Sequence, residues 1–196
     1  MRREHTGLIR VLTRLLLIEL LVHYLPMKSR IQVALLTSDE WSRLRDLRLR
    51  SLSESPDAFG GTLEAEKSFS EEDWRSKLLQ LDYLVASVDS RDGAIMSVEV
   101  LVGDHGTTCW IGGCWSDPQV RGQGTFRALF NYVDQHCESK GWQRQGLGVW
   151  IDNFAAIAAY RALGFAEAGE KKPSERHPGR FYIHMVRESK GTHARD

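Results

Sequence analysis

The sequence predicts an α/β fold of the α+β kind, in which helices flank one mixed, mostly antiparallel sheet. Residues 83–88 and 95–102 have the composition of strands, and the polar segment 89–93 between them is typical of a hairpin. Residues 107–115 form a third strand after a short turn. This strand leads into a glycine-containing loop and an amphipathic helix, an order that suits a mixed sheet better than a doubly wound parallel one.

The segment before these strands supplies a strand and a first helix. Residues 31–36 are apolar enough for a buried strand. Helical periodicity over 41–52 follows Thr37 and Glu40, which have the spacing of a capping box. A run of arginines in this helix is typical of a solvated face, with an anion site as the alternative: Arg43, Arg45, Arg48 and Arg50.

A break and a second helix come next. Segment 55–61 contains proline and two glycines, and we expect it to be the most mobile loop. Ser70 and Asp73 then cap a second helix, whose inward positions are apolar.

The second half of the chain adds two helices and two strands. The amphipathic helix after the glycine loop ends at Gly141. Residues 146–151 form a strand that needs a crossover connection, so we predict that it runs parallel to the strand at 107–115. Asn153 caps a further helix, and residues 181–186 form the last strand.

Length and composition favour one domain, which we place at residues 27–190. The chain has 196 residues, 42% of them hydrophobic, and 26 basic residues balance 26 acidic ones. This balance argues against a nucleic-acid partner. The 7 histidines show no ligand spacing, so no metal site is predicted. The 3 cysteines form no paired motif and are expected to be reduced in the cytoplasm: Cys109, Cys114 and Cys137.

The two ends of the chain are predicted to lie outside this domain. Residues 1–26 carry an apolar run that is too short for a membrane span, contains Glu19 and precedes no small-residue cleavage site. The segment is either an amphipathic helix or an extension upstream of a true start at Met27. No membrane partner is expected. Residues 191–196 form a polar tail.

The loop between the third strand and the amphipathic helix is the first site signal. It reads Gln119-Val120-Arg121-Gly122-Gln123-Gly124. Glycines in a strand-to-helix turn leave backbone N–H groups exposed, and the helix N-terminus adds unpaired donors and partial positive charge. Such a turn suits phosphate, and the alternative is a turn that merely joins strand to helix. The pattern is neither a dinucleotide fingerprint, because Arg127 replaces the third glycine, nor a Walker loop.

Two motifs resemble those of the GNAT superfamily of N-acetyltransferases. Gln119-x-x-Gly122-x-Gly124 is similar to the acetyl-CoA pyrophosphate loop of that family. One helix and one strand later, Asn153-x-x-Ala156-x-x-x-Tyr160-x-x-x-Gly164-Phe165 is similar to a second family signature. Residues 47–59 resemble a stretch common in bacterial members. The resemblance covers residues 31–187 and implies the GNAT fold, in which two neighbouring parallel strands splay apart.

The resemblance also implies which residues bind acetyl-CoA. The end of the third strand would supply backbone groups to the pantetheine arm and the thioester, and the loop amides would take the pyrophosphate. Tyr160 would place its hydroxyl near the sulfur as general acid; a core aromatic is the alternative reading. The predicted cofactor-binding residues are Trp115, Ser116, Asp117, Gln119, Val120, Arg121, Gly122, Gln123, Gly124, Thr125 and Asn153.

The chain departs from the family pattern at two positions. Phe126 stands where a glycine or alanine is common, which would narrow the site or tilt the helix. Thr108 stands where some members carry a general-base glutamate. The base therefore stays unassigned: an ordered water or unaided loss of the amine proton would serve, and the candidate side chains are Glu99, Asp104, His105 and His184.

The sequence therefore predicts an acetyl-CoA-dependent N-acetyltransferase that transfers acetyl directly to the amine of a small molecule or peptide in a ternary complex. The alternatives are a protein N-terminal acetyltransferase and a non-catalytic acetyl-CoA-binding module. By resemblance, residues 55–69 and a loop at 170–180 shape the acceptor pocket. Phe59 either contributes to that pocket or anchors its loop. We expect a monomer or a homodimer.

Overall fold

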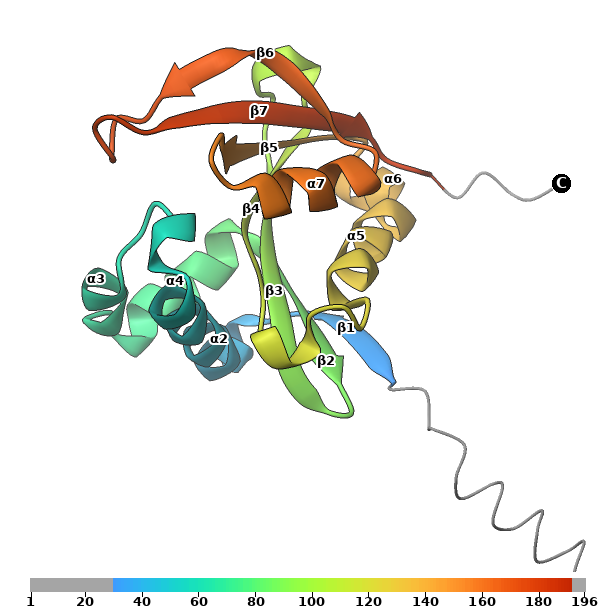
Figure 1. Ribbon diagram of the computed structural model, residues 1–196. Helices are drawn as coiled ribbons and strands as arrows, with labels where there is room; N and C mark the ends of the chain where they lie inside the picture. Colours follow the sequence, from blue (N-terminus) through green and yellow to red (C-terminus); the bar gives the residue numbers. More distant parts are fainter. Residues whose placement is uncertain (1–29, 192–196) are drawn as a thin grey trace, which may run out of the picture.

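The structure is a computed structural model that describes residues 30–191, and it contains one sheet with helices on both faces (Figure 1). The strands are β1 (Ile31–Leu35), β2 (Asp82–Val88), β3 (Arg91–Val100), β4 (Cys109–Ser116), β5 (Arg144–Trp150), β6 (Ala166–Pro173) and β7 (Phe181–Glu188). The helices are α2 (Trp41–Glu54), α3 (Leu63–Lys67), α4 (Glu71–Gln80), α5 (Thr125–Gln135), α6 (Cys137–Lys140) and α7 (Phe154–Ala162). Short 3-10 turns are η1 (Ser38–Glu40), η2 (Pro56–Ala58), η3 (Asp104–Gly106) and η4 (Pro118–Val120).

The predictions for residues 1–26 and 192–196 lie outside the described residues. Among the described helices, none is long and apolar enough to cross a membrane.

The seven strands lie in the order β1-β2-β3-β4-β5-β7-β6. Every neighbouring pair is antiparallel except β4 and β5, which are parallel. This arrangement confirms the predicted mixed sheet. The parallel pairing runs only from Cys109↔Gln145 to Ile111↔Leu147, although β4 continues to Ser116. Beyond Ile111 the two strands separate, which leaves a gap in the middle of the sheet.

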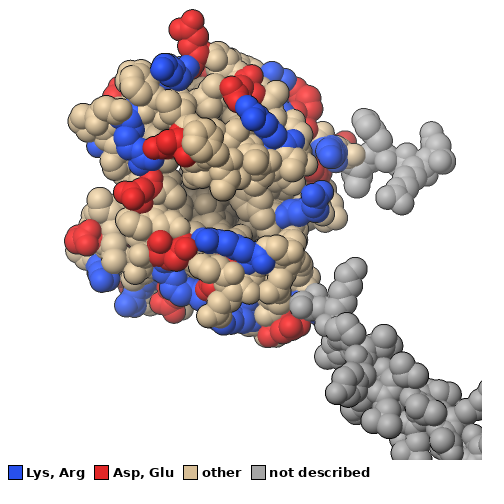
Figure 2. Space-filling view, viewed as in Figure 1, with Lys and Arg blue, Asp and Glu red and all other residues tan. Residues whose placement is uncertain are grey.

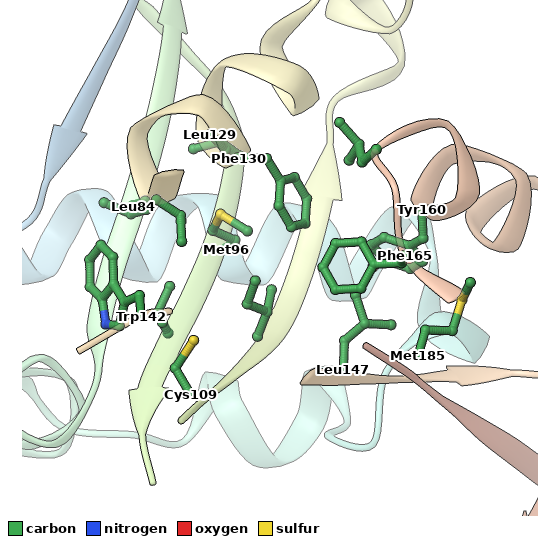
Figure 3. Close-up of a cluster of buried hydrophobic side chains, with 14 of the residues drawn as sticks. Leu84, Met96, Cys109, Leu129, Phe130, Trp142, Leu147, Tyr160, Phe165 and Met185 are labelled. Carbon is green, nitrogen blue, oxygen red and sulfur yellow. The ribbon is translucent and has the colours of Figure 1, made fainter. Parts of the chain in front are cut away.

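Helices cover the two faces of the sheet with separate hydrophobic clusters. Alternate residues of a strand point to opposite faces. Leu84 therefore packs with α5 and α7 on one face, and Val85 packs with α2 and α4 on the other. Figure 3 shows the first cluster, in which Phe130 of α5 lies beside Tyr160 and Phe165. Tyr160 is therefore packed into the core as well as placed at the gap.

The predicted helix caps are present. The Thr37 N–H donates to Glu40 Oε2 at 2.9 Å, and the Ser70 N–H donates to Asp73 Oδ2 at 2.8 Å, so both caps satisfy otherwise unpaired donors. Gly141 has φ of 76°, the left-handed conformation that ends a helix.

Two expectations about element boundaries are wrong. Residues 166–173 form the edge strand β6, so the first part of the loop expected at 170–180, residues 170–173, is strand. The helix expected to run to Gly141 breaks at His136 into α5 and α6.

The arginines of α2 are tied to the sheet and its connections, so the prediction of a solvated face is wrong for three of them. Arg43 pairs with Asp92 at 2.8 Å, and Arg48 pairs with Glu66 at 2.8 Å. Arg50 lies 3.3 Å from the carboxylate of Asp117. Each of these three arginines is paired with a carboxylate, so the alternative that they form an anion site is without support.

Candidate active site

The loop after β4 turns twice before α5 begins. Asp117 Oδ1 accepts from the Gln119 N–H at 2.9 Å. The Val120 N–H then donates to the Asp117 carbonyl at 2.9 Å. Gly122 and Gly124 have φ of 77° and 94°, in the left-handed region that glycine adopts without strain. Gly124 is the N-cap of α5, so the loop delivers its glycines to the helix N-terminus.

These turns divide the loop amides into two groups. The N–H of Val120 bonds to Asp117, and the N–H of Gln123 donates to the Val120 carbonyl at 3.2 Å. The sequence predicts that the loop amides from Val120 to Thr125 bind the pyrophosphate, and two of them are instead bonded within the loop. Within the described chain, no backbone hydrogen bond of the loop uses the remaining amides: Arg121, Gly122, Gly124 and Thr125.

A cavity of about 400 Å³ lies in front of these amides, and we call it the loop-side cavity. Most of the predicted cofactor residues line it: Trp115, Ser116, Arg121, Gly122, Gly124, Thr125 and Asn153. Phe126 lines it too, with its ring centroid 5.6 Å from that of Tyr160. The aromatic residue at this position therefore narrows the cavity against Tyr160.

The other predicted cofactor residues do not line this cavity; they are Asp117, Gln119, Val120 and Gln123. Their environment is structural. Asp117 is buried and bound by Arg50, with Arg91 at 3.6 Å. Val120 is also buried, and a Cβ added at Gly93 would lie 2.8 Å from its side chain. These residues hold the loop against the β2–β3 hairpin.

A second cavity, of about 510 Å³, lies on the other side of Tyr160, and we call it the aromatic cavity. Its walls include Trp110 of β4, Trp150 of β5 and Tyr182 of β7. In Figure 2 the molecule is hollowed between the part that carries β5, β6 and β7 and the part that carries α2, α3 and α4. The two cavities share one wall, formed by Ala58, Phe59, Cys114, Asn153, Ala156 and Tyr160.

The gap between β4 and β5 explains why the cavities meet. After Ile111 the β4 strand carries a bulge, because Ser97↔Gly112 and Ile95↔Trp115 leave one residue more on β4 than on β3. Gly113 in the bulge has φ of 60°. The bulge bends β4 away from β5, and the side of β4 that faces the gap lines both cavities.

Tyr160 stands at the shared wall for reasons that the local sequence supplies. Asn153 Oδ1 accepts from the Ala156 N–H at 3.1 Å and so starts α7. Tyr160 lies on the inward face of this helix, 8% exposed, with its ring 5.8 Å from that of Phe165. Burial, and secondarily contact with Cys114, raises the pKa of Tyr160 well above its ordinary value. The hydroxyl therefore keeps its proton at neutral pH.

Comparison with known families decides what this arrangement is. Residues 41–165, which contain the glycine loop and both cavity walls from β4 and α7, match the Acetyltransferase (GNAT) family. The chain belongs to this family. A comparison with curated proteins finds no match.

Solved structures agree on the GNAT fold. An acetyltransferase of the GNAT family from Streptococcus pneumoniae is 14% identical, with a TM-score of 0.66 over 81% of this chain and 99% of that one. The ribosomal-protein-S5-alanine acetyltransferase from Vibrio fischeri is 17% identical, with a TM-score of 0.66 over 82% and 96%. A putative acetyltransferase from Salmonella typhimurium, solved with its cofactor acetyl-CoA, is 14% identical, with a TM-score of 0.63 over 85% and 98%.

The GNAT family uses acetyl-CoA, and the loop-side cavity fits its phosphates in this chain. A Cβ added at Gly122 would meet nothing within 4 Å, so the space outside the loop is open. The free amides of the loop and the N-terminus of α5 face the same region. Together they offer donors and partial positive charge to an anion.

The candidate bases of this GNAT chain are separated by position. Of the four, His184 alone lines the aromatic cavity. Glu99 is exposed on β3, and Asp104 and His105 are exposed in η3. Thr108, at the position of the family glutamate, donates its hydroxyl to the Gly141 carbonyl at 2.8 Å and has a structural role.

His184 is the centre of a charge cluster that the sequence did not predict. Its Nδ1 is buried and lies 3.7 Å from Asp104 Oδ2, with no hydrogen-bond partner within residues 30–191. Asp104, His105 and His184 place ligand-type atoms within 4.8 Å of one another. The Lys172 ammonium already binds Asp104 Oδ2 at 2.6 Å. Burial first, and Lys172 second, lowers the pKa of His184, so its ring is neutral at pH 7.

Proposed function

We propose that this GNAT protein is an acetyl-CoA-dependent N-acetyltransferase that transfers acetyl directly to the amine of a small molecule or peptide. The shared wall carries this proposal, because Tyr160, Cys114 and Asn153 belong to both cavities. A thioester in the loop-side cavity and an amine in the aromatic cavity would meet there. When bound, acetyl-CoA supplies an activated carbonyl and a thiolate leaving group.

Tyr160 is the proton donor in this proposal. Acetyl transfer needs a donor for the departing sulfur, and a buried hydroxyl with a raised pKa is protonated when the sulfur leaves. Phe126 and Phe165 pack against the ring and fix its position. The donor is therefore preorganised on a rigid helix, which reduces the cost of orienting it during the reaction.

His184 is the proton acceptor for the amine. It lines the aromatic cavity, and its lowered pKa keeps it in the neutral form that a base requires. Since Nδ1 is buried against Asp104, Nε2 is the nitrogen left for the cavity. Asp104 and Lys172 act on the reaction through this ring.

Direct transfer is supported over an acyl-enzyme on Cys114. Cys114 stands at the shared wall, but burial raises the pKa of its thiol to about 12. A thiol that is protonated at neutral pH is a poor nucleophile. The described cysteines are all free, which supports the expected cytoplasmic, reducing environment.

The proposal is tested by measuring acetyl-CoA consumption with a panel of amines for the wild type and Tyr160→Phe. We expect kcat to fall on the order of a hundredfold in Tyr160→Phe while CoA binds unchanged. Tyr132→Phe is the matched control, because Tyr132 lies on α5 and stacks on His136 outside both cavities.

If the wild type binds CoA yet consumes no acetyl-CoA with any amine, the chain is a binding module and the proposed activity is wrong. Equal kcat in Tyr160→Phe and wild type would remove Tyr160 from the reaction.

A further inference from the structure

One wall of the aromatic cavity consists of three neighbouring aromatic side chains, Trp110, His184 and Tyr182. Trp110 and His184 pack edge to face at 4.9 Å between ring centroids, and Tyr182 follows His184 at 5.5 Å. Gly148 is exposed between them, and a Cβ there would lie 3.5 Å from both Trp110 and Tyr182. The absence of a side chain at Gly148 therefore leaves this part of the aromatic wall uncovered. A planar group can pack against it, since aromatic rings pair favourably in edge-to-face or offset arrangements.

The charges around the aromatic cavity are unequal. Among residues 30–191 no carboxylate lines it, and its charged or titratable residues are Arg176, His184 and the shared-wall groups Cys114 and Tyr160, with Tyr182. Figure 2 shows uncharged atoms inside the hollow and charged groups on its rim. With His184 neutral, Arg176 is the one charged side chain that lines the cavity within the described part of the chain.

Arg176 is free to bind a ligand, whereas its neighbour Arg180 is not. Arg180 donates to the Asp57 carbonyl at 2.7 Å, pairs with Asp152 at 3.2 Å and lies over the Trp150 ring at 4.2 Å. Arg176 has no hydrogen bond or ion pair among residues 30–191. Its Nη1 lies 3.4 Å from where a Cβ of Gly60 would be, so its guanidinium reaches across the mouth of the cavity.

This charge distribution also acts on the amine. A cationic wall without a carboxylate destabilises an ammonium ion and favours the neutral amine, which is the reactive form. It equally disfavours polyamines, whose other ammonium groups would find no partner in the cavity. An acceptor with a carboxylate would instead gain a charge-assisted hydrogen bond from the unpaired guanidinium.

We propose that the acceptor is an amine that carries a planar aromatic group and a carboxylate, with the ring packed against the aromatic wall of Trp110 and Tyr182 and the carboxylate on Arg176. This inference rests on the proposed acetyltransferase activity and specifies its substrate class. The amine then points toward His184 and the shared wall.

The test compares acceptors that differ only in charge. L-phenylalanine is paired with L-phenylalaninamide, and 4-(aminomethyl)benzoate with 4-(aminomethyl)benzamide; spermidine is included. Acetylation is measured as kcat/KM, calculated on the neutral amine, for wild type and Arg176→Met. Binding of both benzoic compounds in the presence of CoA is measured by calorimetry as a readout independent of turnover. Arg45→Met is the matched control, because Arg45 is exposed on α2 and does not line the cavity.

We expect the wild type to prefer the carboxylate over the amide in at least one pair, and Arg176→Met to reduce that preference about fivefold to tenfold. Arg45→Met should leave the preference unchanged. The inference is overturned if amides or spermidine are used as well as the carboxylates, or if the preference survives in Arg176→Met. Turnover of any amine leaves the proposed activity intact in that case, so the two failures are distinguishable.

Discussion

The loop-side cavity and the aromatic cavity meet at Tyr160 but are built from different parts of the chain. Most of the loop-side cavity is bounded by one continuous segment, from the end of β4 through the glycine loop to the first turn of α5, with α7 and residues 55–59 completing its walls. The aromatic cavity takes its distinctive side chains from β4, β5, β7 and the segment between β6 and β7.

The difference concerns what each cavity can recognise. Backbone amides recognise a phosphate whatever the side chains beside them, provided that the loop keeps its conformation. Side chains from separate elements can be exchanged one at a time without disturbing the fold. The first construction suits a ligand that stays the same across a family, and the second suits a ligand that differs from member to member.

The largest effect is expected from a charge placed in the loop-side cavity, whose ligand-binding groups are backbone amides. Gly122→Asp adds bulk and negative charge at a residue with φ of 77°, next to the free amides. We expect affinity for CoA to fall on the order of a hundredfold, measured by titration calorimetry. Gly122→Asn is the matched control, since it imposes the same strain without the charge. Thermal melting of both variants checks that they fold. Equal losses in the two variants would mean that conformation, not charge, explains the effect.

A substitution in the aromatic cavity should affect catalysis and leave CoA affinity unchanged. For His184→Gln we expect kcat/KM for the amine to fall on the order of tenfold to a hundredfold. The pH profile distinguishes a base from a packing residue. The lowered pKa of His184 means that wild-type kcat/KM, calculated on neutral amine, falls only below about pH 6.5, and the variant should lack this decline.

His177→Gln serves as the control for this change, because His177 packs on Trp150 but does not line the aromatic cavity. A decline below pH 6.5 that persists in His184→Gln would assign the base elsewhere.

The smallest effect is expected from the charges behind His184. The Lys172 ammonium lowers the pKa of His184, and Asp104 opposes it. Lys172→Met should therefore raise that pKa, so that the acidic limb of the pH profile moves to higher pH and activity at pH 6 falls about twofold. Asp104→Asn should move the limb to lower pH. Asp104 is exposed and Lys172 is partly exposed, so high salt should diminish both shifts. A limb that moves in the same direction in both variants would contradict the arrangement.

The loop-side cavity could be predicted from the sequence because the residues that indicate it are close together in the chain. The glycines are needed where φ is positive, and Asn153 starts α7 by capping it, so the loop and Tyr160 can be placed from nearby residues alone. Even there, sequence reasoning could not tell which amides are free. The hydrogen bonds of Val120 and Gln123 depend on how η4 turns, and no residue type in the loop specifies that.

The aromatic cavity could not be predicted, because its side chains come from separate elements that only the tertiary structure brings together. His184 meets Trp110 and Lys172 only because β7 enters the sheet beside β5 and β6 pairs outside it. The strand β6 itself is polar and mostly exposed, so it has no hydrophobic pattern, and pairing with β7 alone makes it a strand. A histidine among aromatic residues at the end of the chain gives no signal of its own.

Because β4 and β5 separate early, a ligand that binds between them takes the place of a strand in the sheet. In the free protein the edges of β4 beyond Ile111 and β5 beyond Leu147 face each other without pairing. Amides on unpaired strand edges exchange with solvent faster than those in a ladder. A bound pantetheine arm would occupy this gap, slow the exchange of amides at 112–116 and 148–150, and raise the melting temperature in proportion to the logarithm of its concentration. Without the ligand, the sheet at the centre of this protein lacks the hydrogen bonds that an additional strand would make.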